Sequence, residues 1–398
     1  MNKHKKILLC DANFCVLPIL KTIKSYHHSL SVVGSKLDDP AHAIADASIP
    51  INYADTKLLY EHIMENNYDG IVPGCNDRSY LSLSSIAEKM KFPGFDSYET
   101  VLTIHHKDKF RIFAEVKNYP IPKAITSIKQ LHTLTFPILI KPIDSFSGKG
   151  IYKAYSVDEV ANFWQKAQEY SPSGSVVAEE FVEGKLYSHS VFIKNGKIIV
   201  DFFVNEYCTV YPYQVNSSHI ATLLEKKIKE GLRQWTETFA KDLNLCDGLI
   251  HTQFISDNET FSLIEIARRC PGDLYSQLIQ HSTGVDYAAL YTMPFCGLEL
   301  PDDIEKTENR YMARHTVSVN NECVYIGSTL NLTNVKVQNI QLKYSGEKMR
   351  SAPYDKSGIY FIEFESADAM ESNTEQIRDF VQVETLTITN KDAKNGTL

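Results

Sequence analysis

The sequence predicts a multidomain protein of mixed α and β structure, that is, an α/β (α+β multidomain) fold class. The first quarter alternates short apolar runs with amphipathic segments, which is typical of β-α-β units built around a parallel sheet. The middle contains a strong hairpin signal, Asn195-Gly196, between two apolar runs. From about residue 305 the chain is polar and rich in short strands. We therefore expect three domains, over residues 1–95, 96–304 and 305–398.

Composition narrows the class of protein. The 398 residues are 43% hydrophobic and 23% charged with a net charge of −8, as in ordinary soluble proteins. The negative charge and the lack of a basic stripe argue against nucleic-acid binding. No segment approaches the roughly 20 apolar residues of a membrane span, and the amino terminus lacks a signal cleavage site. The cysteines form no CxxC pair. We expect a cytoplasmic protein that acts on small molecules, away from membranes.

The first 95 residues predict a small Rossmann-like domain. Its first turn has no GxGxxG pattern, so a dinucleotide is not expected. Asn76, Asp77 and Arg78 follow the last clear strand, at the edge where open α/β sheets bind ligands. A solvated polar turn would look the same. The expected strands cover 6–11, 30–34, 49–53 and 70–74, and the expected helices cover 15–26 and 56–66.

One stretch of the second domain has the chemistry of a phosphate site. A buried strand over 138–141 ends at Lys141, whose ammonium group is costly to bury without an anion. The following segment, residues 145–150, is small, hydroxyl-bearing and glycine-rich, so its backbone N–H groups can surround phosphate oxygens. A plain hairpin turn could have the same composition. It is not a Walker A loop, because Ile143 stands where the first glycine should be.

A second hairpin offers oxygen ligands for a metal ion. Two strands, 248–256 and 261–266, are joined by a polar turn. Alternation places Gln253 and Glu265 on one face if the register allows it, and Mg²⁺ takes few protein ligands of this kind. The remaining expected helices cover 97–117, with His105-His106 on its surface, 157–170 and 223–243, the last with Trp235 and Phe239 facing inward.

Four segments, in this order, resemble the motifs of the ATP-grasp superfamily and extend over about 165 residues. They are the Asp108-Lys109 helix, residues 138–142 with the glycine loop, residues 178–184, and residues 263–273. The resemblance implies an ATP-grasp domain between a Rossmann-like domain and a β-rich lobe, as in biotin carboxylase. The spelling Glu-x-Ala-x-Arg is most similar to the branch that joins L-amino acids into dipeptides.

The resemblance also implies roles for individual residues. ATP would be held by Lys109, Lys141, Ser147, Gly148, Lys149, Gly150, Glu179, Glu180 and Val182. Mg²⁺ would be held by Gln253 and Glu265. Arg269 would steady the transferred phosphoryl group or a substrate carboxylate, with Lys141 also catalytic, and Gly272 would help to bind the oxyanion. Three positions depart from the family pattern: Leu186 lacks the ribose-binding carboxylate, Gln253 is uncharged, and Ala267 replaces a third metal ligand.

The substrates are less defined by the sequence. An aromatic segment over 206–219 is a candidate lining for the substrate pocket, with Tyr213 and His219 as contacts; packing against the long helix is the alternative. The resemblance implies small-molecule carboxylate and amine substrates and a possible homodimer. A bicarbonate-using carboxylating enzyme and a nucleotide-binding protein without catalysis remain the alternative functions.

Overall fold

The computed structural model describes residues 4–145 and 147–387 of the chain. Two compact units are present. Unit 1 consists of Met1–Asp144, Gly150–Val204 and Ala221–Asn309, and unit 2 consists of Ser145–Lys149, Asn205–Ile220 and Arg310–Leu398. The mixed α/β class expected from the sequence is confirmed by helices and several sheets.

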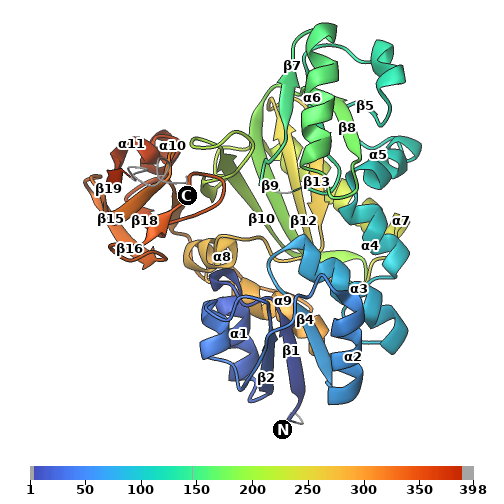
Figure 1. The fold of residues 1–398 in the computed structure, drawn as a ribbon, viewed down its shortest axis with the longest axis vertical. Helices are drawn as coiled ribbons and strands as arrows, with labels where there is room; N and C mark the ends of the chain where they lie inside the picture. Colours follow the sequence, from blue (N-terminus) through green and yellow to red (C-terminus); the bar gives the residue numbers. More distant parts are fainter. Residues whose placement is uncertain (1–3, 146, 388–398) are drawn as a thin grey trace, which may run out of the picture. The chain divides into compact units, whose positions relative to one another are not determined.

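Unit 1 begins with a parallel sheet whose strand order is β3-β2-β1-β4. Strand β1 lies between β2 and β4, so the order of the strands reverses at β1, the position at which open α/β sheets bind ligands. Figure 1 shows α1 on one side of this sheet and α2 and α3 on the other. The elements are β1 Lys6–Cys10, η1 Phe14–Val16, α1 Leu17–Ser25, β2 Ser29–Val33, η2 Pro40–Ala43, β3 Ala47–Ile49, α2 Thr56–Asn66, β4 Gly70–Pro73 and α3 Asp77–Met90.

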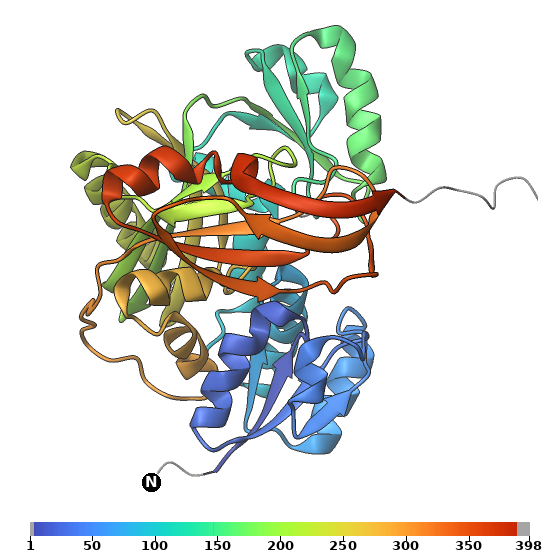
Figure 2. The ribbon, with the colours of Figure 1, turned by 90° about the vertical axis from the view of Figure 1, so that its left-hand side faces the viewer.

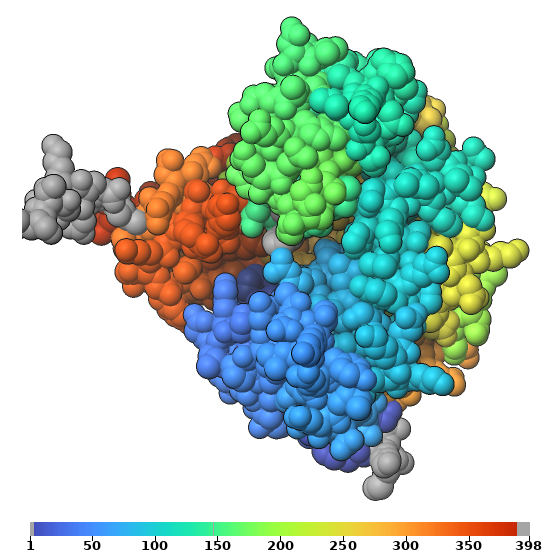
Figure 3. Space-filling model, turned by 45° about the vertical axis from the view of Figure 1, so that its right-hand side comes forward, coloured from blue at the N-terminus to red at the C-terminus, as the bar shows by residue number. Residues whose placement is uncertain are grey.

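A second, antiparallel sheet of unit 1 has the order β5-β8-β6-β7 and is covered by α6. Its register pairs Lys141 with Val177 and Leu139 with Glu179, so Lys141 and Glu179 share one face of the sheet. Figure 3 shows α6 at the surface of this part of unit 1, in green. The elements are β5 Ala124–Ile125, η3 Ile128–Thr133, β6 Ile138–Pro142, β7 Tyr152–Ala154, α6 Val157–Glu169 and β8 Val176–Glu180.

The third sheet of unit 1 runs in the order β13-β12-β9-β10. Gln253 and Glu265 are directly opposite in β12 and β13, which confirms that the two side chains share a face. Behind the sheet, α7 buries Trp235 and Phe239, as expected. Asn195 and Gly196 take positive φ angles of 52° and 71°, as a tight hairpin turn requires. The elements are β9 Lys185–Lys194, β10 Lys197–Tyr207, α7 Lys226–Asp242, β12 Gly248–Ser256, β13 Phe261–Ala267, α8 Tyr275–Thr283 and α9 Tyr287–Phe295.

The expectation of one continuous helix over residues 97–117 is wrong. The structure has two helices, α4 Tyr98–His105 and α5 Lys107–Val116, separated at His106, whose φ and ψ angles of −96° and 117° are extended. His105, expected on a helix surface, has a fully buried side chain.

Unit 2 contains the end of β10 and seven further strands with two short helices, and its residues from 310 on are coloured orange and red in Figure 2. One sheet continues from β10 through β11, β14, β18 and β16, and a smaller sheet has the order β17-β15-β19. None of the helices in the described part of the chain is long and apolar enough to cross a bilayer. The elements are β11 Ser217–Ile220, β14 Tyr311–Val317, β15 Cys323–Leu330, β16 Val335–Gln341, β17 Lys348–Met349, β18 Gly358–Phe364, α10 Ala367–Thr374, α11 Ile377–Phe380 and β19 Val381–Thr387.

Candidate active site

A buried carboxylate with two cations forms the centre of the site in unit 1. Glu179 of β8 forms an ion pair through Oε1 with Lys141 Nζ. Its Oε2 accepts hydrogen bonds of 3.1 and 2.9 Å from Nε and Nη2 of Arg111 on α5. All three side chains are buried. Burial and the nearby positive charges of Arg111 and Lys107 lower the pKa of Lys141 well below its ordinary value. A further anion that reached these cations would therefore favour the charged form of Lys141.

Lys107, which the sequence reasoning missed, faces this centre. Its Nζ lies 3.6 Å from Glu265 Oε1, and its positive charge acts on Lys141. Arg111 follows one helical turn later on the same face of α5. Lys109, the predicted ATP lysine, lies about 200° around the helix from Lys107 and is exposed. The structure thus brings Lys107, Lys141 and Glu265 together and places Lys109 on the outer side of α5.

The hairpin of β12 and β13 presents two oxygen-bearing side chains. Gln253 and Glu265 are cross-strand neighbours, and the Glu265 side chain is 42% exposed. The described residues include no group of three or more histidine, cysteine, aspartate or glutamate side chains suited to a metal. An amide and a carboxylate fit a Mg²⁺ ion that completes its shell with phosphate oxygens and water.

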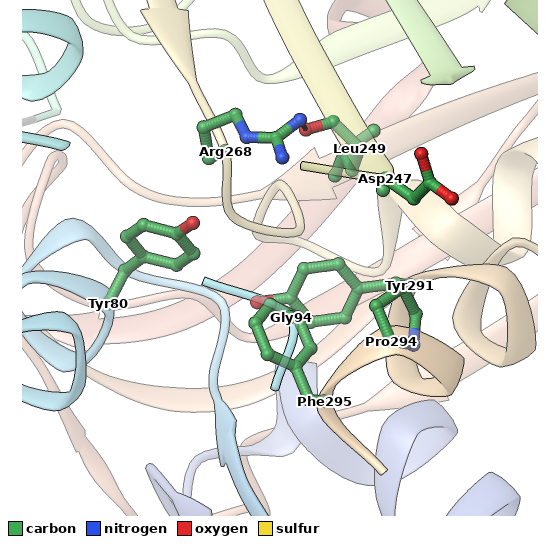
Figure 4. A pocket seen from close by; sticks show the side chains of 9 residues that line it. Tyr80, Gly94, Asp247, Leu249, Arg268, Tyr291, Pro294 and Phe295 are labelled. Carbon is green, nitrogen blue, oxygen red and sulfur yellow. Dashed lines mark hydrogen bonds between the residues drawn. The ribbon is translucent and has the colours of Figure 1, made fainter. Parts of the chain in front are cut away.

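Adjacent arginines at the end of β13 have opposite environments. Arg268 is buried against Asp96, with Nε 2.8 Å from Asp96 Oδ2, and donates to the carbonyls of Leu249 and Cys246. Figure 4 shows it in a small pocket with Leu249 and the rings of Tyr80 and Tyr291 around it. Arg268 therefore has a structural role, because these contacts are all with other parts of the protein.

Arg269 differs from Arg268 in that one of its buried donors makes no hydrogen bond within the described residues. Its Nη2 donates to Asp77 Oδ2 at 2.9 Å, while its buried Nε has no partner among the described residues. Burial opposes the charge, but Asp77 more than offsets this effect and raises the pKa of Arg269 above its usual value. Gly272 lies three residues further on, and a Cβ there would come no closer than 3.9 Å to the Cys75 carbonyl oxygen. A Cβ at this position would therefore make no close contact.

The adenine-side candidates lie at the end of β8. The side chain of Glu180 is on the opposite face of β8 from that of Glu179, and its Oε1 accepts a hydrogen bond of 2.8 Å from the Thr135 N–H. The Glu180 N–H donates to the Lys123 carbonyl oxygen at 3.0 Å. Val182 lies two residues past the end of the strand and its backbone takes no part in the sheet. Of the backbone groups predicted for purine recognition, that of Val182 is the more available.

The glycine loop lies mostly in unit 2. Ser147, Gly148 and Gly150 take positive φ angles of 59°, 72° and 73°. A Cβ at Gly148 would lie 2.6 Å from the Pro212 carbonyl oxygen, so the loop packs closely on the aromatic segment. Lys149 Nζ lies 4.6 Å from the centre of the Tyr354 ring. Phe146 lies outside the described residues. Glycine is therefore required at 148 by both conformation and space.

The predicted substrate residues of unit 2 differ in accessibility. Tyr213 is 37% exposed. His219 has a fully buried side chain: Nδ1 donates to the Ile220 carbonyl at 2.9 Å, and Nε2 lies 3.1 Å from Tyr207 Oη and 3.5 Å from Glu371 Oε2. His219 is thus buried in the packing of unit 2, whereas the side chain of Tyr213 is partly exposed.

Comparison with known proteins agrees with this geometry. Residues 134–277 match the family described as the ATP-grasp domain. A formate-dependent phosphoribosylglycinamide formyltransferase of Prochlorococcus marinus is 31% identical over 173 residues, which cover 41% of this chain and 44% of that relative. The match thus spans less than half of that relative's length.

Solved structures resemble nearly the whole chain. L-amino acid ligase from Bacillus licheniformis has a TM-score of 0.79 with 14% identity, covering 97% of this chain and 100% of that one. Biotin carboxylase from Campylobacter jejuni has a TM-score of 0.75 with 16% identity, covering 97% and 93%. These likenesses concern the fold. Residues 134–277 are thus similar to the ATP-grasp domain family, and nearly the whole chain shares the fold of these solved structures.

Proposed function

We propose that the protein is an ATP-dependent, ADP-forming ligase that joins the carboxylate of an amino acid or peptide-like compound to an amine. The observation that carries this proposal is the meeting of Lys107, Lys141 and Arg111 beside Glu265. Phosphoryl transfer depends mainly on positioning and charge neutralisation, and this set of residues supplies both to a triphosphate.

The reaction would proceed in two steps. Lys107 and Lys141 bind the phosphates while a substrate carboxylate oxygen attacks the γ-phosphorus atom, giving an acyl phosphate and ADP. Mg²⁺ on Gln253 and Glu265 would neutralise charge on the phosphate oxygens when bound. An amine then attacks the acyl carbon, phosphate leaves, and the amine loses a proton. Arg269 and the backbone near Gly272 are suited to stabilise the oxyanion between these events.

The free donors of Arg269 and the glutamate-x-alanine-x-arginine spelling support an amino-acid class of substrate. Formate and bicarbonate are the two alternative acid substrates, and the screen must include both. Formate appears in the name of the formyltransferase relative, and bicarbonate is the acid of the alternative carboxylating function. Equal ADP release with and without any acid would indicate a nucleotide-binding protein without ligase activity.

A screen for ADP release tests the proposal directly. The full-length protein is incubated with MgATP and pairs of amino acids, with formate or bicarbonate plus an amine, or with no substrate. We expect ADP and phosphate in equal amounts with at least one amino-acid pair, and loss of the signal in Lys141→Met. ADP release with formate or bicarbonate alone would contradict the amino-acid assignment. No release above the substrate-free rate, with any acid, would contradict the ligase function itself.

A further inference from the structure

Asp77, at the start of α3, and His105, at the end of α4, lie between the first sheet of unit 1 and the β13 end that carries Arg269. We propose that these two side chains are positioning residues that hold the Arg269 guanidinium in its working orientation. The inference rests on the proposed function, because it assigns Arg269 to the reacting groups. It gives the residues before 96 a direct part in the ligase site.

The Asp77 carboxylate is shared between two donors. Oδ2 accepts from Arg269 Nη2 at 2.9 Å, and Oδ1 accepts from His105 Nδ1, also at 2.9 Å. A carboxylate held at both oxygens cannot rotate without losing one contact. Burial raises the pKa of Asp77, but Arg269 and His105 more than offset this and keep it well below the usual range. Asp77 is thus ionised and fixed.

The tautomer of His105 follows from its second contact. The backbone N–H of Arg268 donates to His105 Nε2 at 3.3 Å, so Nε2 carries no proton. The ring proton is therefore on Nδ1, where it is donated to Asp77. The side chain has no exposed surface, and its ring is stacked on Tyr80 with centroids 4.9 Å apart at an angle of 19°. The imidazole cannot turn away from Asp77 in this packing.

These hydrogen bonds form a chain that begins and ends on two neighbouring residues, Arg268 and Arg269. It begins at the backbone N–H of Arg268, passes through His105 and Asp77, and ends at Nη2 of Arg269. The guanidinium is thereby fixed relative to its own backbone. Its buried Nε, which has no partner within the described segments, stays available to a ligand oxygen. A planar guanidinium held at one nitrogen presents its remaining donors in a defined direction.

The experiment separates positioning from binding. Asp77→Asn keeps the size of the side chain but leaves one oxygen, so it can accept from only one of its two donors. With the substrates found in the screen, we expect kcat to fall about 10- to 100-fold, because misplacement of a catalytic group by about 1 Å has effects of this size. The KM for ATP and the Kd for MgADP should change less than about twofold, since neither Asp77 nor His105 faces the group of Lys107, Lys141 and Arg111. Glu61→Gln, which makes the same carboxylate-to-amide change at an exposed position of α2, is the matched control.

A second readout does not depend on activity. Nitrogen-15 NMR of histidine-labelled protein, with His105→Asn to assign the signal, should find the Nδ1-protonated tautomer in the wild type. In Asp77→Asn the His105 Nδ1 signal should shift, because a neutral amide replaces the carboxylate beside it. An Nε2-protonated His105 in the wild type, or an unchanged kcat in folded Asp77→Asn, would overturn the proposal. Absence of ADP release by the wild type would refute the ligase function instead, and the NMR result would then decide the relay by itself.

Discussion

At the scale of single residues, the site depends on how buried charges are paired. Glu179 neutralises Lys141 and Arg111 inside the protein, and Lys107 faces Glu265 at the margin. Removing one partner from a buried pair costs about 3–5 kcal/mol, because the remaining charge is left in a medium of low dielectric. The same residues therefore contribute to the fold and, on the proposed function, to phosphate binding.

Lys107 and Lys109 provide a matched pair for testing the phosphate site. Lys107→Met removes the cation that faces Glu265, and we expect the KM for ATP to rise about tenfold or more, which corresponds to about 1.4 kcal/mol of lost binding. Lys109→Met should leave it within about twofold, because this side chain is exposed on the other side of α5. Steady-state ADP release measures both. A larger effect at Lys109 would restore the assignment made from the sequence.

The difference between these two lysines has a physical cause. The motif locates a lysine in this helix, but which lysine faces inward depends on where the helix begins. The break at His106 starts α5 at Lys107 and turns Lys107 and Arg111 toward the sheet. His106 has no Pro or Gly beside it, so no local sequence signal marks the break. The contact of Asp77 with Arg269, between residues 192 positions apart, is equally invisible to local reasoning.

At the scale of elements, strand register was the most predictable feature of the site. The period of two along residues 248–256 and 261–266 predicted that Gln253 and Glu265 share a face, and the structure pairs them directly. Lys141 at the end of a buried strand was likewise found buried beside an anion. The register depends on neighbours across one turn and the burial of Lys141 on the apolar run before it, whereas its anion, Glu179, lies 38 positions away in the sequence.

The glycine loop leads to a prediction about conformation. Gly148→Ala would place a Cβ 2.6 Å from the Pro212 carbonyl oxygen and require φ near +72°, so we expect the loop to shift and the ligase rate to fall at least about tenfold. Gly174→Ala has a similar φ of +69°, but its Cβ would meet no described atom within 4 Å. Its rate should stay near that of the wild type. Equal losses in the two variants, measured by ADP release, would point to backbone strain alone.

At the scale of the molecule, the two compact units were less predictable than the elements. The sequence places residues 145–149 and 205–220 in the central domain, whereas their contacts group them with the carboxyl-terminal strands. Membership of a unit depends on long-range packing, such as the antiparallel pairing of β11 with β14. The three-domain division thus remains a proposal about folding units.

A buried histidine on β14 predicts how stability depends on pH. Burial, with the charges of Arg314 and Arg378, lowers the pKa of His315 to about 3 from an ordinary value of 6.5. The unfolded chain therefore binds a proton between these values that the folded chain does not, so stability falls as the pH decreases from 6.5 toward 3. The loss from this group is at most roughly 4–5 kcal/mol.

His315→Asn tests this dependence, because asparagine can still contact Ser217, the partner of His315 Nδ1. Urea unfolding at pH 7, 5.5 and 4.5 should give a smaller loss of stability with acid in the variant than in the wild type. Parallel losses in both proteins would show that other groups govern the acid response.

The ion pairs of Glu179 with Lys141 and Arg111 affect which other anions could bind to these two cations. Glu179 is tethered beside Lys141 and Arg111, so its effective concentration there is far above that of any free ion. Inorganic phosphate or sulfate, which can make few additional contacts, competes poorly against it. On the proposed function, a nucleotide triphosphate that also reaches Lys107 and the hairpin of Gln253 and Glu265 would make additional contacts with which to displace it. The site would then discriminate against small anions in favour of a nucleotide.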